Sequence, residues 1–329
     1  MACGAADLCF VKYTVTDSNL EKSITDDLAE LAQSPGLTRA TQTTWVYSDM
    51  ENSNQYDGGR GVSEIEIYDS TGNTREDDGD SCVDDTSWTD PLGGADCASF
   101  APPDDCTTQY DGSSAPAVIQ AACPRTCGVC SGTKFHGSRY ITYDHSLSKL
   151  IVHTRLSGEQ NSDTTSVLQA FLTTAFTDCV TKGSDEFMLV FSSHGTGYAG
   201  FGGDDNVARR RLLNSNANIA TGISAALTAA NVPGSKLDVL GFDACLMASY
   251  AAVAAYADLA SYYIASEAVE PGSGWDFTKL VAADGTALTA ARELHSGFLT
   301  SSMPDGTIQS PMTLAIIGEK LSCICNNAP

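Results

Sequence analysis

Short runs of apolar residues alternate along the chain with segments whose apolar residues recur every three or four positions. Glu186–Phe191 and Leu237–Phe242 are nearly continuous apolar runs, which is typical of parallel strands buried on both faces. Leu20–Gln33 has apolar residues at helical spacing and ends before a Pro-Gly pair. The same reasoning predicts strands at Leu8–Val15, Thr43–Ser48, Ser261–Ala265 and Met312–Gly318, and hairpin-like strands at Ser63–Tyr68 and Ser138–Thr154. It predicts helices at Asp163–Val180, Ser215–Ala230, Leu246–Asp258 and Thr286–Thr300.

This alternation of strands and helices predicts an α/β fold with a mostly parallel central sheet. Sites in such sheets lie at the C-terminal ends of the strands. The segment 69–131 interrupts the alternation, because its apolar residues follow no sustained period. We therefore expect a main domain made of residues 1–68 and 132–329, with residues 69–131 as an insert.

The composition of the insert differs from that of the rest of the chain. From Asp69 to Cys130 it holds 11 Asp and one Glu against two Arg, and it contains no Lys. An even number of cysteines in a small segment predicts a disulfide scaffold. A zinc site is the weaker alternative, because no His lies inside the segment. Six of the 12 cysteines fall here, at Cys82, Cys97, Cys106, Cys123, Cys127 and Cys130.

A disulfide scaffold indicates an oxidising compartment, so we expect an extracellular or secretory-pathway protein. The first ten residues, MACGAADLCF, lack a basic flank followed by a long apolar stretch, so no signal peptide is visible. The start is therefore truncated, or the chain is exported in another way. Elsewhere, Cys179 is expected to be a core residue or an unused thiol, and Cys3, Cys9, Cys323 and Cys325 could pair.

The net charge narrows the classes of partner. The chain has 18 Lys and Arg against 41 Asp and Glu, a net charge of −23. Such an acidic surface argues against nucleic acid or an anionic membrane as a partner. No run of 18 apolar residues occurs, so no membrane span is expected. Cationic substrates suit this charge, although acidity also serves solubility alone.

Two chemically reactive side chains follow the two most apolar strands. The first strand leads into His194-Gly195, and the second leads into Asp243 and Cys245. If the strands are neighbours, the imidazole can activate the thiol as a nucleophile. Cys245 would also open the predicted helix Leu246–Asp258, whose N-terminus lowers a thiol pKa. The amides of Gly195 and Cys245 could then form an oxyanion hole.

The alternative is structural. A Cys after an apolar strand is most often a small buried hydrophobe, and a single His after a strand is usually structural. The sequence around these residues changes that balance, because it resembles the clostripain family of cysteine peptidases, which belong with caspases, gingipains and legumain. The matching motifs span everything but the insert: Tyr13–Glu21 (YTVTDSNLE), Phe191–Gly195 (FSSHG), Gly241–Ala248 (GFDACLMA) and Ala265–Trp275 (ASEAVEPGSGW).

The resemblance implies a caspase-like α/β/α sandwich, with His194 as the catalytic histidine and Cys245 as the nucleophile. It implies a cysteine endopeptidase that acts on peptides or proteins with Arg or Lys before the scissile bond. The chemistry of such an enzyme requires no cofactor. The alternatives are a ligase or a peptidase with acidic preference, and an inactive peptidase-like protein whose insert binds an extracellular partner.

Asp243 lies two residues before Cys245 and therefore points the same way from the strand. In the clostripain family the matching Asp selects Arg or Lys, as expected of a partly buried carboxylate that needs a cation. The alternative is that Asp243 caps the following helix. The family often has a second acid at the position of Ser273, and Glu267 or Glu270 could replace it or serve loop structure.

The interval between His194 and Cys245 holds two further features. Relatives are often activated by self-cleavage after a basic residue here, which implies processing after Arg209, Arg210 or Arg211. The alternative is that these arginines form a solvated charge cluster.

The segment Gly200–Asn206 is rich in oxygen ligands, and clostripain needs calcium. The spacing does not match an EF-hand loop, so an acidic loop without calcium is favoured.

The end of the insert, Cys123–Cys130 (CPRTCGVC), resembles the sea-anemone-toxin-type (ShKT) module. Six cysteines allow 15 connectivities. The resemblance implies the pairs Cys82–Cys130, Cys97–Cys123 and Cys106–Cys127. The channel-blocking Lys of the toxins is absent, because the segment has no Lys. We expect a stabilising or docking appendage.

Overall fold

The computed structural model describes residues 6–16, 20–50, 67–72, 89–91, 118–119, 137–157, 160–203, 214–282, 284–300 and 312–316. The chain divides into two compact units, one made of Met1–Glu76 with His136–Pro329 and the other of Asp77–Phe135. The predicted bounds of the insert stay a prediction. Its six cysteines lie outside the described residues, as do the three disulfides expected there.

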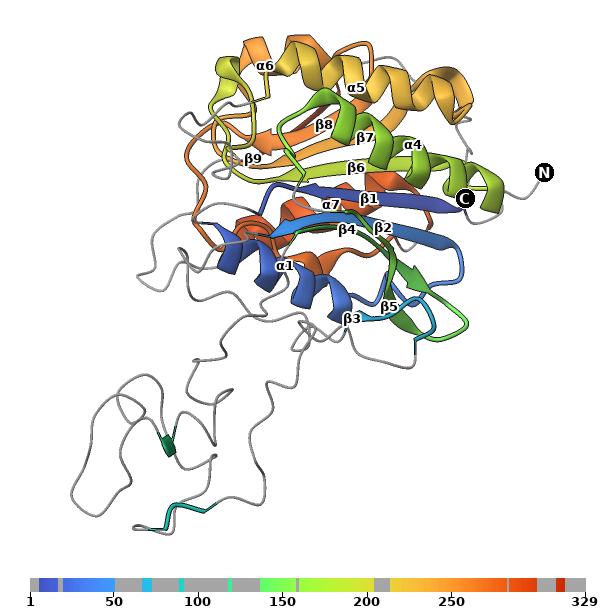
Figure 1. Ribbon diagram of the computed structural model, residues 1–329. Coiled ribbons are helices and arrows are strands. Elements are labelled where there is room, and N and C mark those ends of the chain that lie inside the picture. The colour runs from blue at the N-terminus through green and yellow to red at the C-terminus, as the bar shows by residue number, and fades with distance from the viewer. Residues whose placement is uncertain are drawn as a thin grey trace. The chain divides into compact units, whose positions relative to one another are not determined.

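The larger unit is built on one mixed sheet, which crosses the centre of Figure 1. The described strands follow the order β3-β5-β4-β2-β1-β6-β7-β8-β9. The central strands β2, β1, β6, β7 and β8 run parallel to one another. The strands are β1 (Leu8–Thr14), β2 (Gln42–Met50), β3 (Ile67–Tyr68), β4 (Gly137–Asp144), β5 (Lys149–Arg155), β6 (Glu186–Ser192), β7 (Leu237–Asp243), β8 (Ala260–Ser266) and β9 (Met312–Ile316).

Helices cover both faces of this sheet. Figure 1 shows α4, α5 and α6 on one side and α1 and α7 on the other. This arrangement confirms the predicted α/β class with a mostly parallel sheet. The helices are α1 (Glu21–Gln33), α4 (Thr165–Lys182), α5 (Asn216–Ala229), α6 (Tyr250–Tyr256) and α7 (Ala287–Thr300), with short 3-10 turns η3 (Gly197–Ala199), η4 (Pro233–Ser235) and η5 (Phe277–Lys279).

Strand β1 shows how the two faces are divided. Successive side chains of a strand point to opposite faces. Cys9, Val11 and Tyr13 therefore belong to the apolar core beneath α4 and α5. Lys12 points to the other face, where it meets Asp27 of α1. All four side chains are at most 2% exposed, so β1 is buried on both faces.

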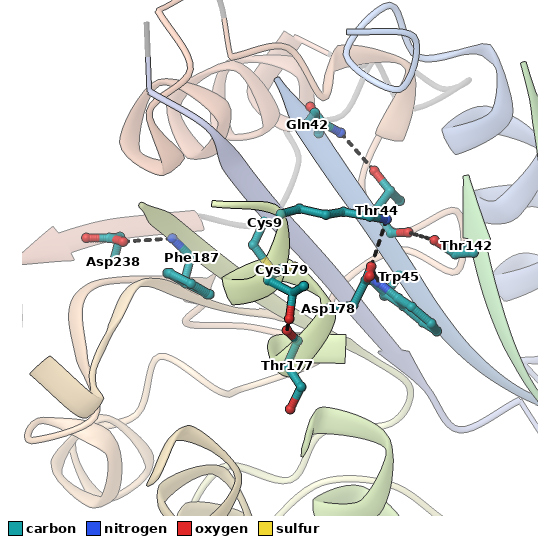
Figure 2. Close-up of a disulfide and its surroundings, with 12 residues drawn as sticks. Cys9, Gln42, Thr44, Trp45, Thr142, Thr177, Asp178, Cys179, Phe187 and Asp238 are labelled. Carbon is teal, nitrogen blue, oxygen red and sulfur yellow. Dashed lines mark hydrogen bonds and ion pairs between the residues drawn. A yellow bond between two sulfur atoms is a disulfide. The ribbon is translucent and has the colours of Figure 1, made fainter. Parts of the chain in front are cut away.

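A disulfide joins β1 to α4 on the first of these faces. Cys9 and Cys179 are bonded, with their Cα atoms 5.7 Å apart and 170 residues between them in sequence (Figure 2). Beside it, the indole N–H of Trp45 donates to Asp178 at 2.8 Å. Cys179 is a buried core residue, as one of the two expectations had it, and the other expectation, an unused thiol, is wrong. The suggestion that Cys9 could pair with Cys3, Cys323 or Cys325 is also wrong, because Cys9 is bonded to Cys179. The bond needs β1 and α4 to pack together, a contact that cysteine spacing alone does not reveal.

Three predicted elements differ in detail. The predicted hairpin-like segment Ser138–Thr154 is confirmed as the antiparallel β4 and β5. The hairpin-like interpretation of Ser63–Tyr68 is wrong for its described part, because β3 pairs in parallel with β5. The last strand β9 runs antiparallel to β8. The predicted helix Leu246–Asp258 is wrong at its start, because α6 begins only at Tyr250. None of the helices in the described part of the chain is long and apolar enough to cross a bilayer.

Candidate active site

The two strands that precede His194 and Cys245 are neighbours. Strands β6 and β7 pair in parallel, and Ser192 at the end of one faces Asp243 at the end of the other. His194 and Cys245 each follow two residues later. The condition for their convergence, adjacent strands with C-terminal ends at one edge of the sheet, is therefore met.

A cavity of about 270 Å³ lies at this edge of the sheet. His194, Asp243 and Cys245 all line it. The loop after β8 contributes Glu270, and α1 contributes Asp27. The helix α1 and the C-terminal ends of β6, β7 and β8 with their following loops thus supply an imidazole, a thiol and three carboxyls to one cavity. A concave surface of this kind is the common form of a ligand site.

Cys245 is partly buried, and it is the one cysteine without a disulfide among the described residues. The backbone N–H of Glu270 donates to its Sγ at 3.4 Å. The expected help from a helix N-terminus is wrong, because α6 begins only at Tyr250, with four residues between it and Cys245. The loop after β8 therefore reaches the Cys245 sulfur with a backbone amide, and the helix does not.

The chain turns sharply just after Cys245. Leu246 has φ 63°, a left-handed conformation that is costly for a branched side chain. Its N–H donates to the carbonyl of Ala268 at 3.0 Å, which ties the turn to the loop after β8. The turn therefore directs the Cys245 side chain into the cavity without the support of a helix.

Gly195 packs against the backbone of Cys245. A Cβ at this position would collide with the carbonyl oxygen of Cys245 and lie 2.9 Å from Cγ of Met247. Only glycine therefore allows the loops after β6 and β7 to approach so closely. The sequence predicted an oxyanion-hole role for the Gly195 amide, and the structure gives a packing reason for the glycine as well.

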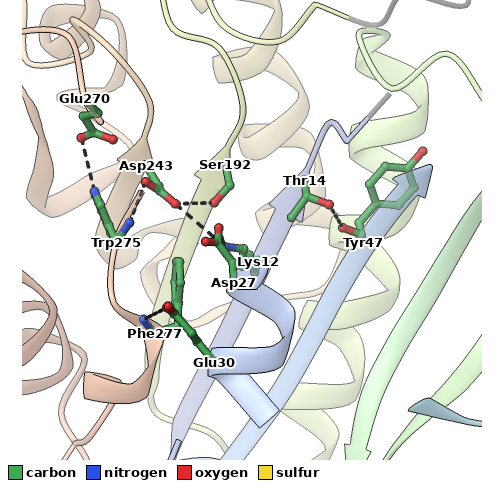
Figure 3. A network of polar contacts seen from close by, with 10 residues as sticks. All are labelled: Lys12, Thr14, Asp27, Glu30, Tyr47, Ser192, Asp243, Glu270, Trp275 and Phe277. Atoms are coloured by element: carbon green, nitrogen blue, oxygen red, sulfur yellow. Dashed lines mark hydrogen bonds and ion pairs between the residues drawn. The ribbon is translucent and has the colours of Figure 1, made fainter. Parts of the chain in front are cut away.

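Asp243 is held from several sides. It is 6% exposed. Its Oδ2 accepts from Ser192 Oγ at 3.1 Å, and its Oδ1 accepts from the backbone N–H of Trp275 at 3.2 Å (Figure 3). The capping alternative is wrong, because Ser249 caps α6 by accepting from Ala252 N–H. Asp243 is therefore a buried carboxyl in the wall of the cavity.

A buried ion pair lies beneath Asp243. Lys12 is 0% exposed, and its Nζ lies 2.7 Å from Oδ2 of Asp27 and 4.0 Å from Oδ2 of Asp243. The same ammonium lies 3.5 Å from the ring centroid of Phe277. Burial raises the pKa of Asp27 well above its usual range, although Lys12 acts in the opposite direction.

Known proteins were compared with this chain and with its fold. The model of the clostripain family matches residues 131–323, which is more than half of the chain. The chain belongs to the clostripain family. The predicted family is thereby confirmed. A search of curated proteins found no match.

Solved structures of clostripain-family (C11) proteins share the fold. One is a secreted C11 cysteine protease from Bacteroides thetaiotaomicron bound to an irreversible peptide inhibitor, with 16% identity and a TM-score of 0.55 over 95% of this chain. Another is an inactive zymogen C11 protease from Parabacteroides distasonis, with 13% identity and a TM-score of 0.53 over 96% of this chain. The chain covers 66% and 64% of their lengths.

The loop after β8 carries two glutamates, and one of them lines the cavity. Glu270 lines the cavity, and its Oε1 accepts from the indole N–H of Trp275 at 3.3 Å. Burial raises the pKa of Glu270 well above its usual range, and repulsion from Asp243 adds to this. Glu267, the other candidate to replace the acid missing at Ser273, is exposed and does not line the cavity.

Lys12 and Asp27 were not predicted from the sequence as residues of the site. A signal existed, because a single Lys inside the apolar run LCFVKYTV must be paired if it is buried. Its partner Asp27 lies on the buried face of α1, one helical turn after Ser23 and Ile24, which also line the cavity.

Two predicted features fall wholly or partly outside the described residues. Arg209, Arg210 and Arg211 belong to the segment 204–213, which the structure does not describe. Of the suggested calcium segment, Gly200–Gly203 is described, and Gly203 N–H donates to both carboxyl oxygens of Asp163 at 3.2 Å. Within the described ranges no group of three His, Cys, Asp or Glu could hold a metal ion.

Proposed function

We propose that this chain is a cysteine endopeptidase that cleaves after Arg or Lys. The observation that carries the proposal is that Cys245 and His194 line one cavity whose wall contains the buried carboxyl of Asp243. A thiol, an imidazole and an anionic specificity group within one concave site are what acyl transfer at a basic residue requires.

The proposed reaction proceeds in two stages. The Sγ of Cys245 attacks the carbonyl carbon of the basic residue, and the thiol proton passes to His194. The C–N bond breaks as His194 gives this proton to the leaving amine, and a thioester remains. Water then attacks the thioester, a proton passes to His194, and the C–S bond breaks to release the acid and the thiolate.

The oxyanion of each tetrahedral intermediate would be held by backbone amides. The close packing of Gly195 on the backbone of Cys245 supports this assignment, because it brings the two peptide groups together at the edge of the cavity. Removing one donor of this kind from an enzyme costs about 100- to 1000-fold in kcat. No metal or organic cofactor enters the proposed steps.

The preference for a basic residue follows from the charges around the cavity. Asp27, Asp243 and Glu270 line it, whereas Lys12 beneath it is the one cation paired with this group in the described structure. Three carboxyls therefore face one ammonium. A guanidinium or ammonium group of a substrate supplies the missing positive charge, and a neutral or acidic side chain does not.

Activation by self-cleavage after Arg209, Arg210 or Arg211 is part of the proposal. The segment that carries them is anchored at both ends beside the site: Gly202 N–H donates to the carbonyl of His194 at 2.9 Å, and Asn214 pairs with Phe201. N-terminal sequencing of active protein tests this, and a single intact chain with full activity would refute it.

We also propose an extracellular or secretory location. The Cys9–Cys179 disulfide supports it, because such bonds persist in oxidising compartments. The expected disulfides of the insert would be stable in the same surroundings. Isolation of the protein from culture medium, with non-reducing mass spectrometry of its cysteine peptides, tests both points.

The test of the proposed activity is hydrolysis of matched fluorogenic peptides ending in Arg, Lys, Asp or Asn. We expect cleavage after Arg or Lys that falls by at least ~1000-fold in Cys245→Ala and in His194→Ala. Assays with added calcium and with a chelator decide the calcium question. If folded and deliberately nicked protein cleaves no peptide, the alternative is favoured: an inactive relative whose insert binds an extracellular partner.

A further inference from the structure

Exposed apolar side chains gather where β6, β7 and β8 end. Seven large apolar side chains are exposed in the described part of the chain, and four of them follow these three strands. The four are Tyr198 (82% exposed), Leu246 (39%), Tyr250 (90%) and Val269 (64%). Single exposed apolar residues are ordinary, but several at one edge of a protein indicate an interaction surface. The reaction proposed above uses none of these side chains.

Three of the four lie on neighbouring stretches of backbone. Tyr198 belongs to η3, and the residue before it, Gly197, packs on the turn after β7. A Cβ on Gly197 would lie 3.1 Å from the carbonyl oxygen of Leu246 and 3.1 Å from Oγ of Ser249. Tyr250 follows Ser249 as the first residue of α6, and η3 and α6 are in contact. We refer to Tyr198, Leu246 and Tyr250 together as the apolar rim.

The conformation of Leu246 does not explain its side chain. With φ 63° it occupies the left-handed region, where Gly or Asn is cheaper than a branched residue. The turn would therefore form more readily with either of those residues. Because the side chain stays 39% exposed, burial in the free protein offsets only part of this cost. A costly apolar residue directly after the proposed nucleophile indicates that the side chain has a function.

The proposed mechanism decides which part of a substrate meets the apolar rim. His194 gives a proton to the leaving amine, so the segment after the scissile bond begins beside His194. Along the edge of the sheet the order is β6, β7, β8, so the loop that carries Tyr198 lies on the His194 side of Cys245, and Val269 lies on the other. The cavity reaches Asp27 of α1, whereas α6 covers the opposite face of the sheet (Figure 1).

We propose that the apolar rim binds the apolar or aromatic side chain that directly follows the scissile bond, so that the enzyme selects Arg or Lys followed by such a residue. This rests on the proposed function of the cavity as the site for the basic side chain. Contact between the two apolar surfaces removes both from water and stabilises the transition state of acylation. The thioester has already lost the leaving segment, so the preference belongs to acylation and is measured as kcat/KM.

The kinetic test uses internally quenched peptides that differ only in the residue after Arg, which is Leu, Phe, Ser or Asp. We expect the wild type to cleave the Leu and Phe peptides with a kcat/KM about 3- to 10-fold above that of the Ser peptide. The ratio of these values is formed within each variant, so a general loss of activity cancels.

Two rim variants and one control decide the origin of this ratio. Leu246→Asn introduces a polar residue that tolerates the left-handed conformation, and it should bring the ratio close to one. Tyr198→Ser should lower the ratio as well, and a side chain that is 82% exposed can be removed without disturbing the core. Leu147→Asn is the control, because Leu147 is also 39% exposed but lies in the turn between β4 and β5, at the opposite edge of the sheet. It should keep the wild-type ratio.

A second test examines the same surface from the product side. The thioester is formed from an Nα-acetyl-arginine ester in the presence of leucine amide or serine amide. The added amine attacks the thioester carbonyl, the C–S bond breaks, and the amine proton passes to His194 and then to the Cys245 thiolate. We expect leucine amide to capture about 3- to 10-fold more of the acyl group than serine amide, and Tyr198→Ser to remove the difference.

The outcomes separate this proposal from the function on which it rests. Equal kcat/KM for all four peptides, with cleavage after Arg intact, would overturn the proposal and leave the proposed function standing. So would a ratio that both rim variants retain. Equal cleavage together with a molar mass in solution that Tyr198→Ser lowers would overturn it in favour of contact between two copies of the chain. Failure to cleave any of the peptides would instead refute the proposed function.

Discussion

The buried ammonium of Lys12 allows a sharp test of how the site is supported. Lys12→Met keeps the length and most of the volume of the side chain, and the sulfur can still contact the ring of Phe277. The change removes the positive charge from a position that is 0% exposed. It leaves Asp27 as a buried carboxyl without its partner at 2.7 Å.

Removing one member of a buried ion pair costs about 3–5 kcal/mol, because the other charge remains desolvated. The contact with the Phe277 ring adds about 0.5–2 kcal/mol, part of which methionine recovers. We therefore expect Lys12→Met to lower the free energy of unfolding by about 3–5 kcal/mol. The double variant Lys12→Met/Asp27→Asn should recover part of this loss, because position 27 then carries no unpaired buried charge, whereas Asp243 still loses the ammonium at 4.0 Å.

The assay is urea unfolding followed by tryptophan fluorescence, with the four proteins of a double-mutant cycle measured at one pH. Asp27→Asn alone should cost less than Lys12→Met, because Lys12 still has Asp243 at 4.0 Å. It should also weaken cleavage after Arg, because the freed ammonium then competes with the substrate for Asp243. Additive effects of the two changes, or a loss below about 1 kcal/mol in Lys12→Met, would refute this account of the pair.

Three other predictions test separate parts of the structure. Gly195→Ala should reduce kcat by at least ~100-fold with a stability loss of about 1–3 kcal/mol, because the new Cβ collides with the loop after β7; unchanged steady-state kinetics would contradict the packing. Replacing both Cys9 and Cys179 by Ala should lower stability by about 2–5 kcal/mol, because the disulfide closes a sequence separation of 170 residues; denaturant unfolding with and without a reductant tests this, and an equal effect of reductant on both proteins would count against it. The pKa of Glu270 is raised in the folded protein, so folding favours the protonated carboxyl, and ionisation at high pH destabilises the wild type. Glu270→Gln should therefore raise the melting temperature at pH 8 and change it little near pH 4. A difference in melting temperature between variant and wild type that is the same at every pH would contradict this prediction.

Much of the fold follows from local patterns. The continuous apolar runs that became β6 and β7 were recognisable because strands buried on both faces must be apolar throughout. The helix α1 was recognisable from the spacing of Ile24, Leu28 and Leu31, which are all buried. The start of α6 was misjudged, because the turn after Cys245 depends on a hydrogen bond from Leu246 to Ala268 in a distant loop.

Part of the candidate site could likewise be predicted from the sequence, and part of it could not. The residues His194, Gly195, Asp243 and Cys245 could be named from the sequence, because each directly follows or ends a recognisable strand. Glu270 could be named only as one of two options, since nothing in the sequence shows which carboxyl of that loop faces the cavity.

The sequence by itself determined the order of strands and helices, the membership of the clostripain family and the side chains that carry the proposed chemistry. These depend on the periodicity of nearby residues and on short motifs. Only the tertiary structure decided that Lys12 pairs with Asp27 beneath the cavity, that Cys9 bonds to Cys179, and that Glu270 rather than Glu267 lines the cavity. The physical reason is that a buried charge or thiol finds its partner through the packing of elements far apart in sequence, which local patterns do not encode.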